Sequence, residues 1–221
     1  RKLGDKFNHM VEEIGSVEML RTDFVNSFSH EFKTPIVSIR GFAKALKWED
    51  LTPEERNEYL DIIISESERL SSLSANVLYL SKIEKQTILT DKRRFNLSEQ
   101  IRLVIALLDQ KLADKNLEVV FDNWECYTIG NEEMLKQVWI NLLDNAIKFS
   151  HVGGQINVVV KEIEGDTVVQ IQNRGEEIPP EMRAHIFDKF YQGDRSHSTE
   201  GNGLGLAIVK KIIDLHNGNI S

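Results

Sequence analysis

The sequence predicts a protein with two structural parts, an α-helical hairpin followed by a mixed α/β domain. Apolar residues recur at helical spacing through about the first 85 residues, which indicates long amphipathic helices. Two later segments alternate apolar and polar residues, as half-buried strands do, and the tight turn Glu164-Gly165-Asp166 joins them. Residues 86–94 break both patterns and are predicted to be a linker.

The composition argues against several classes of binding partner and against a membrane-spanning segment. Of 221 residues, 41% are hydrophobic and 28% charged, so the chain can bury a core. The net charge of -8 argues against nucleic acid or anionic lipid as a main partner. The single cysteine, Cys126, excludes an internal disulfide and fits a reducing compartment. No apolar run approaches the ~20 residues that cross a bilayer.

The ends of the sequence predict a fragment of a longer protein. The chain opens in the middle of a helical pattern, without a methionine, and stops where a strand is expected to begin. We therefore expect any membrane contact to come only through missing N-terminal segments.

The first part is predicted to contain a hairpin of two helices. Residues 3–17 carry apolar side chains at alternating spacings of four and three, which is a coiled-coil seam, and a similar seam runs through 25–46. Thr52 suits a helix N-cap and Pro53 the first helical position of a second helix. Because two helices close a core poorly, we expect two hairpins to pair as a dimeric four-helix bundle.

The second part is predicted to be an α/β domain with a polar, glycine-containing loop near its end. Helices are expected at about 98–114, 131–149 and 204–216, strands at 155–163 and 167–173, an apolar stretch at 117–121 and the loop at 188–203.

His30 is predicted to be an exposed, reactive histidine. The apolar residues Phe28 and Phe32 lie two positions on either side of it, so His30 points away from the seam. This argues against a histidine that simply packs in the core. An exposed imidazole with one free nitrogen can act as a nucleophile.

The neighbours of His30 favour this interpretation over a metal site. Glu31 can polarise the other ring nitrogen, Thr34 lies on the same helical face, and Pro35 loosens the helix because it cannot donate to the carbonyl of Glu31. A zinc site of the H-E-x-x-H type needs a second histidine where Thr34 stands.

A second group of polar residues lies on the helix predicted at 131–149. Asn141, Asn145 and Lys148 are spaced by four and three, so they form one ridge. Asparagine oxygen is a fair ligand for Mg²⁺, and lysine suits phosphate. The alternative is an ordinary solvated helix face.

Three glycines precede the last predicted helix. Gly201, Gly203 and Gly205 allow backbone N–H groups to turn toward an anion at a helix N-terminus. No Gly-Lys-Ser/Thr follows, which excludes a P-loop, and no strand precedes them, which excludes a Rossmann fingerprint. A hinge or a tight packing turn remains the alternative.

Taken in order, these motifs resemble those of the sensor histidine kinases of two-component signalling. The H box corresponds to His30–Pro35, the N box to Asn141–Ser150, the first glycine box to Asn173–Ile178, the F box to Ile186–Phe190 and the second glycine box to Gly201–Leu206.

The resemblance implies a fold and a division into domains. It implies residues 1–20 as the end of a HAMP-like signalling helix and 21–88 as a dimerisation and histidine phosphotransfer hairpin. Residues 89–221 would be an ATP-binding α/β sandwich like those of gyrase and Hsp90, with a mixed sheet covered by helices on one face and a missing C-terminal end. The chain would be the cytoplasmic fragment of a membrane-anchored bacterial protein.

The resemblance also implies the chemistry. His30 would take the γ-phosphate of ATP and pass it to an aspartate on the receiver domain of a response regulator. Glu31 would act as the general base. Thr34 would help to place water for the reverse, phosphatase, reaction. The protein would work as a homodimer.

For the nucleotide, the resemblance implies that Asn145 holds Mg²⁺, with Asn141 in support and Lys148 on the phosphates. The further residues implied to contact ATP are Asn173, Gly175, Ile178, Gly201, Gly203, Leu204, Gly205 and, in a mobile lid, Arg195. The other histidines are interpreted as surface or packing residues, namely His9, His151, His185, His197 and His216.

Two positions depart from the family pattern. Asn173 stands where an aspartate usually accepts a hydrogen bond from the adenine amino group, and a neutral amide should bind more weakly. Glu177 replaces a glycine. Two alternatives therefore stay open: a kinase-impaired regulator phosphatase or signalling scaffold, and an ATPase of the gyrase or Hsp90 type.

Overall fold

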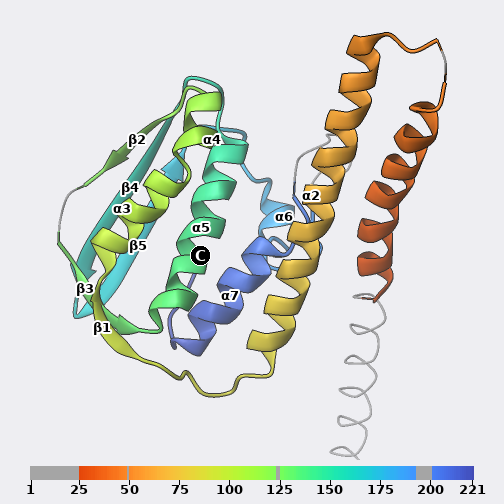
Figure 1. Ribbon diagram of the computed structural model, residues 1–221. Coiled ribbons are helices and arrows are strands. Elements are labelled where there is room, and N and C mark those ends of the chain that lie inside the picture. Colours follow the sequence, from red (N-terminus) through yellow and green to blue (C-terminus); the bar gives the residue numbers. More distant parts are fainter. Residues whose placement is uncertain (1–24, 49, 123–124, 193–200) are drawn as a thin grey trace, which may run out of the picture. The chain divides into compact units, whose positions relative to one another are not determined.

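The computed structural model describes residues 25–48, 50–122, 125–192 and 201–221 (Figure 1). The chain divides into two compact units, Arg1–Leu78 and Tyr79–Ser221. The predicted HAMP-like end at 1–20 lies outside the described residues. Within the described residues, no helix combines the length and the apolar character that a membrane span requires.

The first unit is a hairpin of two helices. One helix covers residues 25–45, and α2 (Pro53–Glu84) begins in this unit. Thr52 caps α2 as predicted: its Oγ1 accepts a hydrogen bond from the N–H of Glu55 at 3.2 Å, and Glu55 Oε2 accepts one from the N–H of Thr52 at 2.9 Å. This reciprocal capping box satisfies two backbone donors that would otherwise have no helical partner.

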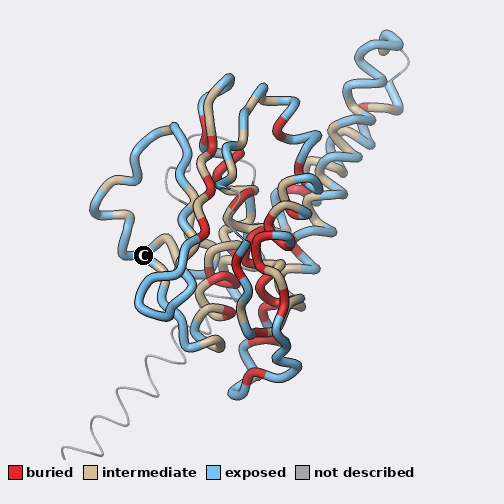
Figure 2. Tube along the Cα trace, turned by 90° about the vertical axis from the view of Figure 1, so that its left-hand side faces the viewer, coloured by how far each residue is buried: buried red, intermediate tan, exposed pale blue. Residues whose placement is uncertain are grey.

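The hairpin buries few of its apolar side chains by itself. Ala45 and Leu73 are its buried hydrophobic residues in the part of the chain that the structure describes, and most of its trace is exposed or intermediate (Figure 2). Val25 and Ile36 belong to the predicted inward seam, yet they are 52% and 50% exposed. A single hairpin offers each helix only one neighbour, so part of the apolar surface stays uncovered.

The second unit contains the predicted mixed sheet. β2 (Glu118–Phe121) runs parallel to β4 (Gln155–Ile163), and β4 pairs antiparallel with β5 (Asp166–Asn173). The turn between β4 and β5 has positive φ at both Glu164 (53°) and Gly165 (90°). Such two-residue turns match the twist of a hairpin, which explains the sharp reversal.

Four helices lie on one face of this sheet (Figure 1): α3 (Leu97–Leu107), α4 (Asp109–Asp114), α5 (Glu132–Phe149) and α7 (Gly205–Leu215). The short α6 (Pro180–Arg183) lies between β5 and α7 in sequence. The single helix predicted at 98–114 is wrong, because the chain breaks at Leu108, whose φ and ψ are -97° and 7°. The prediction of helices on one face of a mixed sheet is confirmed.

A second, two-stranded sheet lies partly in the predicted linker. β1 (Arg93–Asn96) pairs antiparallel with β3 (Tyr127–Gly130), and neither strand was predicted. Residues 219–221, where a strand was expected, have no regular structure. Four-residue strands carry too little alternation to be recognised in a sequence.

The core of the second unit lies between the sheet and the helices (Figure 2). Alternate β4 residues point inward, with Ile156 and Val158 fully buried, and Ile101 of α3 and Ile212 of α7 are fully buried too. Trp139 is also buried, and its Nε1 donates to Gln100 Oε1 at 2.8 Å. The buried polar atoms of this pair are therefore satisfied.

Candidate phosphoacceptor and nucleotide site

His30 is exposed on the first helix, as the sequence predicts. Phe28 and Phe32 are half-buried, and their ring centroids lie 4.4 Å apart. Thr34 is also exposed, and its Oγ1 donates to the carbonyl of His30 at 3.3 Å. The imidazole and the threonine hydroxyl therefore lie one turn apart on an accessible part of the hairpin.

Glu31 forms an ion pair that the sequence did not predict. Arg69 of α2 donates from Nη2 to Glu31 Oε2 at 3.1 Å, and its Nη1 lies 3.8 Å from Glu66 Oε2. Glu31 and Arg69 are 38 positions apart, so no local spacing in the sequence links them. The acid beside His30 is thus anchored to the second helix of the hairpin.

The polar ridge lies on α5. Asn131 caps this helix, since its Oδ1 accepts from the N–H of Met134 at 3.0 Å. Asn141, Asn145 and Lys148 are half-buried along one side, while the residues that face the core are buried. The predicted ridge is therefore present, with its groups at intermediate depth between core and solvent.

The glycine segment that precedes α7 lies directly against this ridge. A Cβ atom on Gly205 would be 2.8 Å from Asn141 Oδ1, and one on Gly201 would be 2.6 Å from Lys148 Nζ. Gly201 has a φ of 149°, which side chains rarely allow. The ridge and the glycine segment are far apart in the sequence, and together they form a polar cradle at the N-terminus of α7.

Gly203, in the same glycine segment, contacts Phe190 at the end of the F box. Its φ is 64°, and a Cβ would lie 2.6 Å from the carbonyl carbon of Phe190. The N–H of Phe190 donates to Gly203 O at 2.8 Å, and Gln192 Nε2 donates to Gly201 O at 2.9 Å. Gln192 was not predicted as a site residue. Its role is visible only once the segment folds back.

Gly175 permits the closest backbone approach in this region. A Cβ on Gly175 would stand 1.8 Å from the carbonyl oxygen of Phe149, at the end of α5. Ser150 and Gly175 form an isolated β-bridge. Asn173 is exposed at the end of β5, and Ile178 is 46% exposed. The first glycine box is thereby brought to the end of α5 that carries Lys148.

A lysine holds this end of α5 in place. Lys115 Nζ donates to the carbonyls of Lys148 at 2.6 Å and Ile147 at 3.1 Å. A cation at a helix C-terminus satisfies carbonyls that have no helical partner and interacts favourably with the helix dipole. Lys115 therefore fixes the backbone from which the Lys148 side chain extends.

Two further residues singled out in the sequence, Leu204 and Glu177, differ in their exposure to solvent. Leu204 is 0% exposed, so its side chain packs in the core, and its backbone N–H donates to Asn202 Oδ1 at 3.3 Å. Glu177 pairs with Arg183 at 2.8 Å on the surface. Arg195 lies outside the described residues.

His216 is a packing residue, as predicted, with a defined bonding role. Its Nδ1 donates to the carbonyl of Ile212 at 2.8 Å, so its Nε2 is free to accept from the N–H of Asn131 at 3.0 Å. Burial lowers the pKa of His216. The neutral ring thus ties the C-terminal end of α7 to the N-terminal end of α5.

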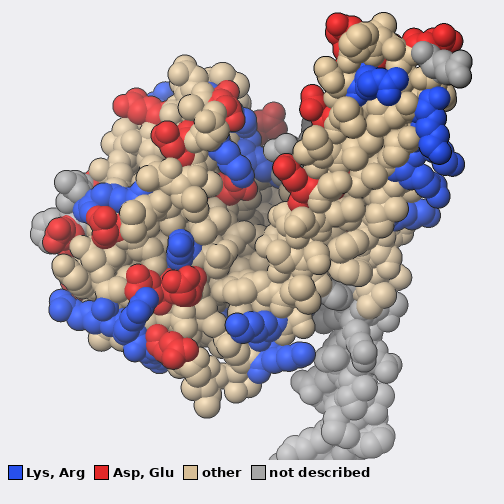
Figure 3. All heavy atoms as spheres, in the orientation of Figure 1, with Lys and Arg blue, Asp and Glu red and all other residues tan. Residues whose placement is uncertain are grey.

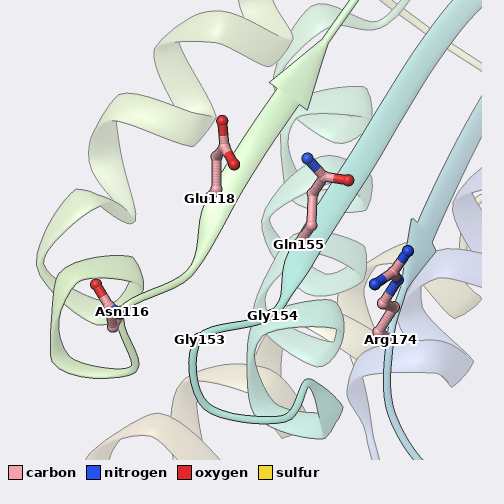
Figure 4. Close-up of a pocket in the computed structure, with 6 residues that line it drawn as sticks. All are labelled: Asn116, Glu118, Gly153, Gly154, Gln155 and Arg174. Carbon is pink, nitrogen blue, oxygen red and sulfur yellow. The ribbon is translucent and has the colours of Figure 1, made fainter.

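A polar cavity of about 410 Å³ lies elsewhere on this unit (Figure 4). It is lined by Asn116, Glu118, Gly153, Gly154, Gln155 and Arg174. Glu118 and Gln155 come from the paired strands β2 and β4, whereas the other four come from the turns and loops at the ends of the strands. Arg174 lies within the first glycine box (Asn173–Ile178), and the other five residues lie outside the predicted motifs.

The cradle suits a nucleotide and its metal. Among the described residues, no group of three or more histidine, cysteine, aspartate or glutamate side chains is arranged to hold a metal ion. Mg²⁺ typically keeps several waters and phosphate oxygens and needs few protein ligands, so a single amide such as Asn145 fits it. The side-chain-free space at Gly201 and the Lys148 ammonium suit the phosphates.

Family models match both units. Residues 20–86 match the His Kinase A (phospho-acceptor) domain, and residues 130–221 match the histidine kinase-, DNA gyrase B- and HSP90-like ATPase. A phosphoacceptor hairpin joined to an ATPase domain of this type defines the class of protein-histidine kinases. The chain belongs to the sensor histidine kinases.

Particular relatives agree with this assignment. The heme sensor protein HssS of Staphylococcus aureus (strain Newman) is 33% identical over 97% of this chain, which spans 46% of HssS. The chain thus spans about half the length of the curated relatives it matches. The histidine kinase ThkA, solved in complex with the response regulator protein TrrA, superimposes with a TM-score of 0.74 at 28% identity. That match covers 96% of this chain and 60% of the other.

The catalytic domain of ThkA alone is 33% identical, with a TM-score of 0.51. The match covers 57% of this chain and 81% of the ThkA catalytic-domain chain.

Proposed function

We propose that this chain phosphorylates itself on His30 with ATP and passes the phosphoryl group to an aspartate on the receiver domain of a response regulator. One ring nitrogen of His30 attacks the γ-phosphorus, an N–P bond forms, and the bond to the oxygen that bridges the β- and γ-phosphates breaks. ADP leaves, and the proton on the other ring nitrogen passes to the Glu31 carboxylate.

The observation that carries this proposal is the exposure of His30 within the matched phospho-acceptor domain. Phosphoryl transfer needs mainly positioning and neutralisation of charge, so an accessible nucleophile and a separate phosphate cradle suffice. The contact of Lys148 with the glycine segment supports that cradle. The hairpin at 21–88 and the ATP-binding domain at 89–221 are the functional domains in this proposal.

Within the nucleotide site, we assign the metal to Asn145, with Asn141 in support and Lys148 on the phosphates. Bound Mg²⁺ would neutralise charge on the phosphate oxygens. Asn173 and Ile178, exposed at the neighbouring edge, would contact the adenine. Gly175, Gly201, Gly203 and Gly205 would let the backbone approach the ligand, as would the backbone of Leu204, and Arg195 would belong to the lid.

The charge on the first helix supports a response regulator as partner. Lys33, Arg40 and Lys44 are exposed and spaced by seven and four, so they share one face of the helix that carries His30, and the exposed Lys47 follows in the turn after it. Figure 3 shows basic side chains along one side of the hairpin, in a chain whose net charge is -8. A basic strip attracts an acidic partner. ThkA, with a response regulator bound, is the precedent.

Uncovered apolar side chains support a homodimer. Ile36 and Val37 on the first helix and Leu60 and Ile64 on α2 are between 42% and 55% exposed. Pairing with a second hairpin would bury them in a four-helix bundle. Membrane attachment would come only through segments N-terminal to this chain.

A kinase-impaired regulator phosphatase is the second candidate. Thr34 lies one turn from His30, where its hydroxyl can help to place water on the phosphorylated regulator. Asn173 lacks the charge of the usual aspartate, and Glu177 is held by Arg183 where the family has glycine. Both features favour weaker ATP binding.

The test is incubation with γ-labelled ATP and Mg²⁺, comparing the wild type with His30→Gln and with the matched control His151→Gln. His151 is an equally exposed histidine outside the site. We expect stable label on the wild type and the control and none on His30→Gln. Labelling that survives in His30→Gln contradicts the proposal. Nucleotide binding without label supports the phosphatase or scaffold, and free phosphate without protein label supports an ATPase.

A further inference from the structure

The charged cluster next to His30 contains two carboxylates and one cation. Glu31 comes from the first helix, and Glu66 and Arg69 come from α2. The Arg69 guanidinium lies between the two acids, with Nη2 3.1 Å from Glu31 Oε2 and Nη1 3.8 Å from Glu66 Oε2. One cation must therefore serve two acids.

The two acids are not equally satisfied. Glu31 accepts a charge-assisted hydrogen bond from Arg69, which is the stronger kind of contact. Glu66 Oε2 is buried and has no hydrogen-bond partner, because 3.8 Å exceeds hydrogen-bond range. A buried carboxylate oxygen without a donor is unfavourable, so the observed arrangement favours Glu31 at the expense of Glu66.

A small movement of Arg69 reverses this preference. Glu66 and Arg69 are three residues apart on α2 and so are neighbours on its surface. A shift of about 1 Å brings the guanidinium within hydrogen-bond range of Glu66. When this shift also draws Nη2 away from Glu31, the Glu66 oxygen gains the donor it lacks and the Glu31 carboxylate loses its partner. Each arrangement then leaves one carboxylate without a hydrogen bond from Arg69, and the two side chains are similarly exposed, at 24% for Glu31 and 23% for Glu66.

We propose that Arg69 is a positioning residue that exchanges between Glu31 and Glu66 and thereby controls when Glu31 is available to His30. The proposal rests on the function proposed above for His30 and Glu31. With Arg69 on Glu31, as in this structure, the base is withheld. Among the residues that the structure describes, no hydrogen bond joins Glu31 to His30. With Arg69 on Glu66, Glu31 is free to accept the imidazole proton.

The test compares four proteins: the wild type, Glu66→Gln, Arg69→Gln and the double variant. Glu66→Gln removes the alternative acid, so Arg69 stays on Glu31. We expect its kcat for self-phosphorylation to fall about tenfold with KM for ATP unchanged. Arg69→Gln releases Glu31, so its kcat should equal or exceed that of the wild type. Glu68→Gln, the same substitution as Glu66→Gln at an exposed position of α2, is the matched control.

The double variant gives the decisive comparison. It lacks both the restraining cation and the buried charge, so it should fold, and its kcat should return to the wild-type value or above. Rescue of one loss by a second substitution is not expected of residues with a merely structural role. A double variant as slow as Glu66→Gln overturns the proposal, and so does a tenfold slower Arg69→Gln beside a normal Glu66→Gln.

A second measurement is independent of ATP. Diethyl pyrocarbonate carbethoxylates a neutral imidazole nitrogen, and a carboxylate that accepts the other ring N–H makes that nitrogen more nucleophilic. Mass spectrometry of the His30 peptide should give the slowest reaction for Glu66→Gln and recovery in the double variant. Equal rates in all four proteins overturn the exchange. If the wild type takes no label from ATP, the proposed function fails, and the order of these rates still decides the role of Arg69.

Discussion

The hairpin unit and the α/β unit differ in how they bury apolar side chains. In the α/β unit, helices close over a sheet, and residues such as Ile101, Ile156 and Ile212 are fully buried. In the described part of the hairpin, Ile64 is 55% exposed and Ile36 is 50% exposed. The α/β unit has a complete core within one chain, whereas the hairpin leaves an apolar face for another subunit.

The largest expected effect comes from glycines that occupy opposite environments in the two units. A Cβ at Gly175 would meet the backbone oxygen of Phe149 at 1.8 Å, whereas one at Gly41, on the first helix, meets nothing within 4 Å. We expect Gly175→Ala to destabilise the α/β unit by about 3 kcal/mol, because backbone cannot move aside cheaply. Gly41→Ala should stabilise the hairpin by about 0.5–1 kcal/mol through helix propensity.

Denaturant unfolding followed by circular dichroism gives both free energies. Equal unfolding midpoints for Gly175→Ala and Gly41→Ala would contradict the predicted difference in stability, and would mean that Gly175 is not tightly packed in solution.

An intermediate effect is expected at exposed isoleucines. Ile64 of the hairpin is 55% exposed, and Ile163, at the end of β4, is 44% exposed. Ile64→Ser should weaken dimerisation at least about tenfold, because each subunit loses roughly 1.5–3 kcal/mol of apolar burial. Ile163→Ser should leave dimerisation unchanged. Sedimentation equilibrium measures both, and equal dissociation constants would place the dimer contact elsewhere.

The smallest effect is a pH dependence confined to the α/β unit. Burial lowers the pKa of His216 below its ordinary value of 6.5, so the unfolded chain binds the proton more readily than the folded one. Stability should therefore be fully present above pH 6.5 and should fall as the pH drops below it. Protonation also removes the acceptor for the N–H of Asn131.

The control for this pH effect is His216→Gln. This variant should be less stable at pH 7.5 and should lose the extra destabilisation between pH 6.5 and 5.5 in thermal melts. A pH profile identical to that of the wild type would contradict the assignment to His216.

Elements with long, regular patterns could be predicted from the sequence. The helix of Asn141 and Lys148, the two long strands and the outward direction of His30 follow from periodicity alone. The break at Leu108 could not be predicted, because apolar spacing continues through it and only the tertiary packing ends the helix. β1 and β3 are too short to show alternation, and they pair with each other in a sheet separate from that of β2, β4 and β5.

In the candidate site, the sequence identified residue types but not their contacts. Gly205 against Asn141 and Gly201 against Lys148 are approaches between residues 64 and 53 positions apart, set by the packing of α7 on α5. Arg69 was missed for the same reason. An arginine on a polar helix face looks ordinary until the hairpin places it against Glu31.

Helix α2 continues without a break from the first unit into the second. It runs for 32 residues, about 48 Å, and contains no glycine and no proline after Pro53. Arg69 lies on its first part, whereas Leu80 and Ile83, further along, are buried in the second unit. Kinks usually occur at proline or glycine, and α2 has neither after Pro53. The residue that contacts Glu31 and two core residues of the second unit therefore belong to one uninterrupted helix.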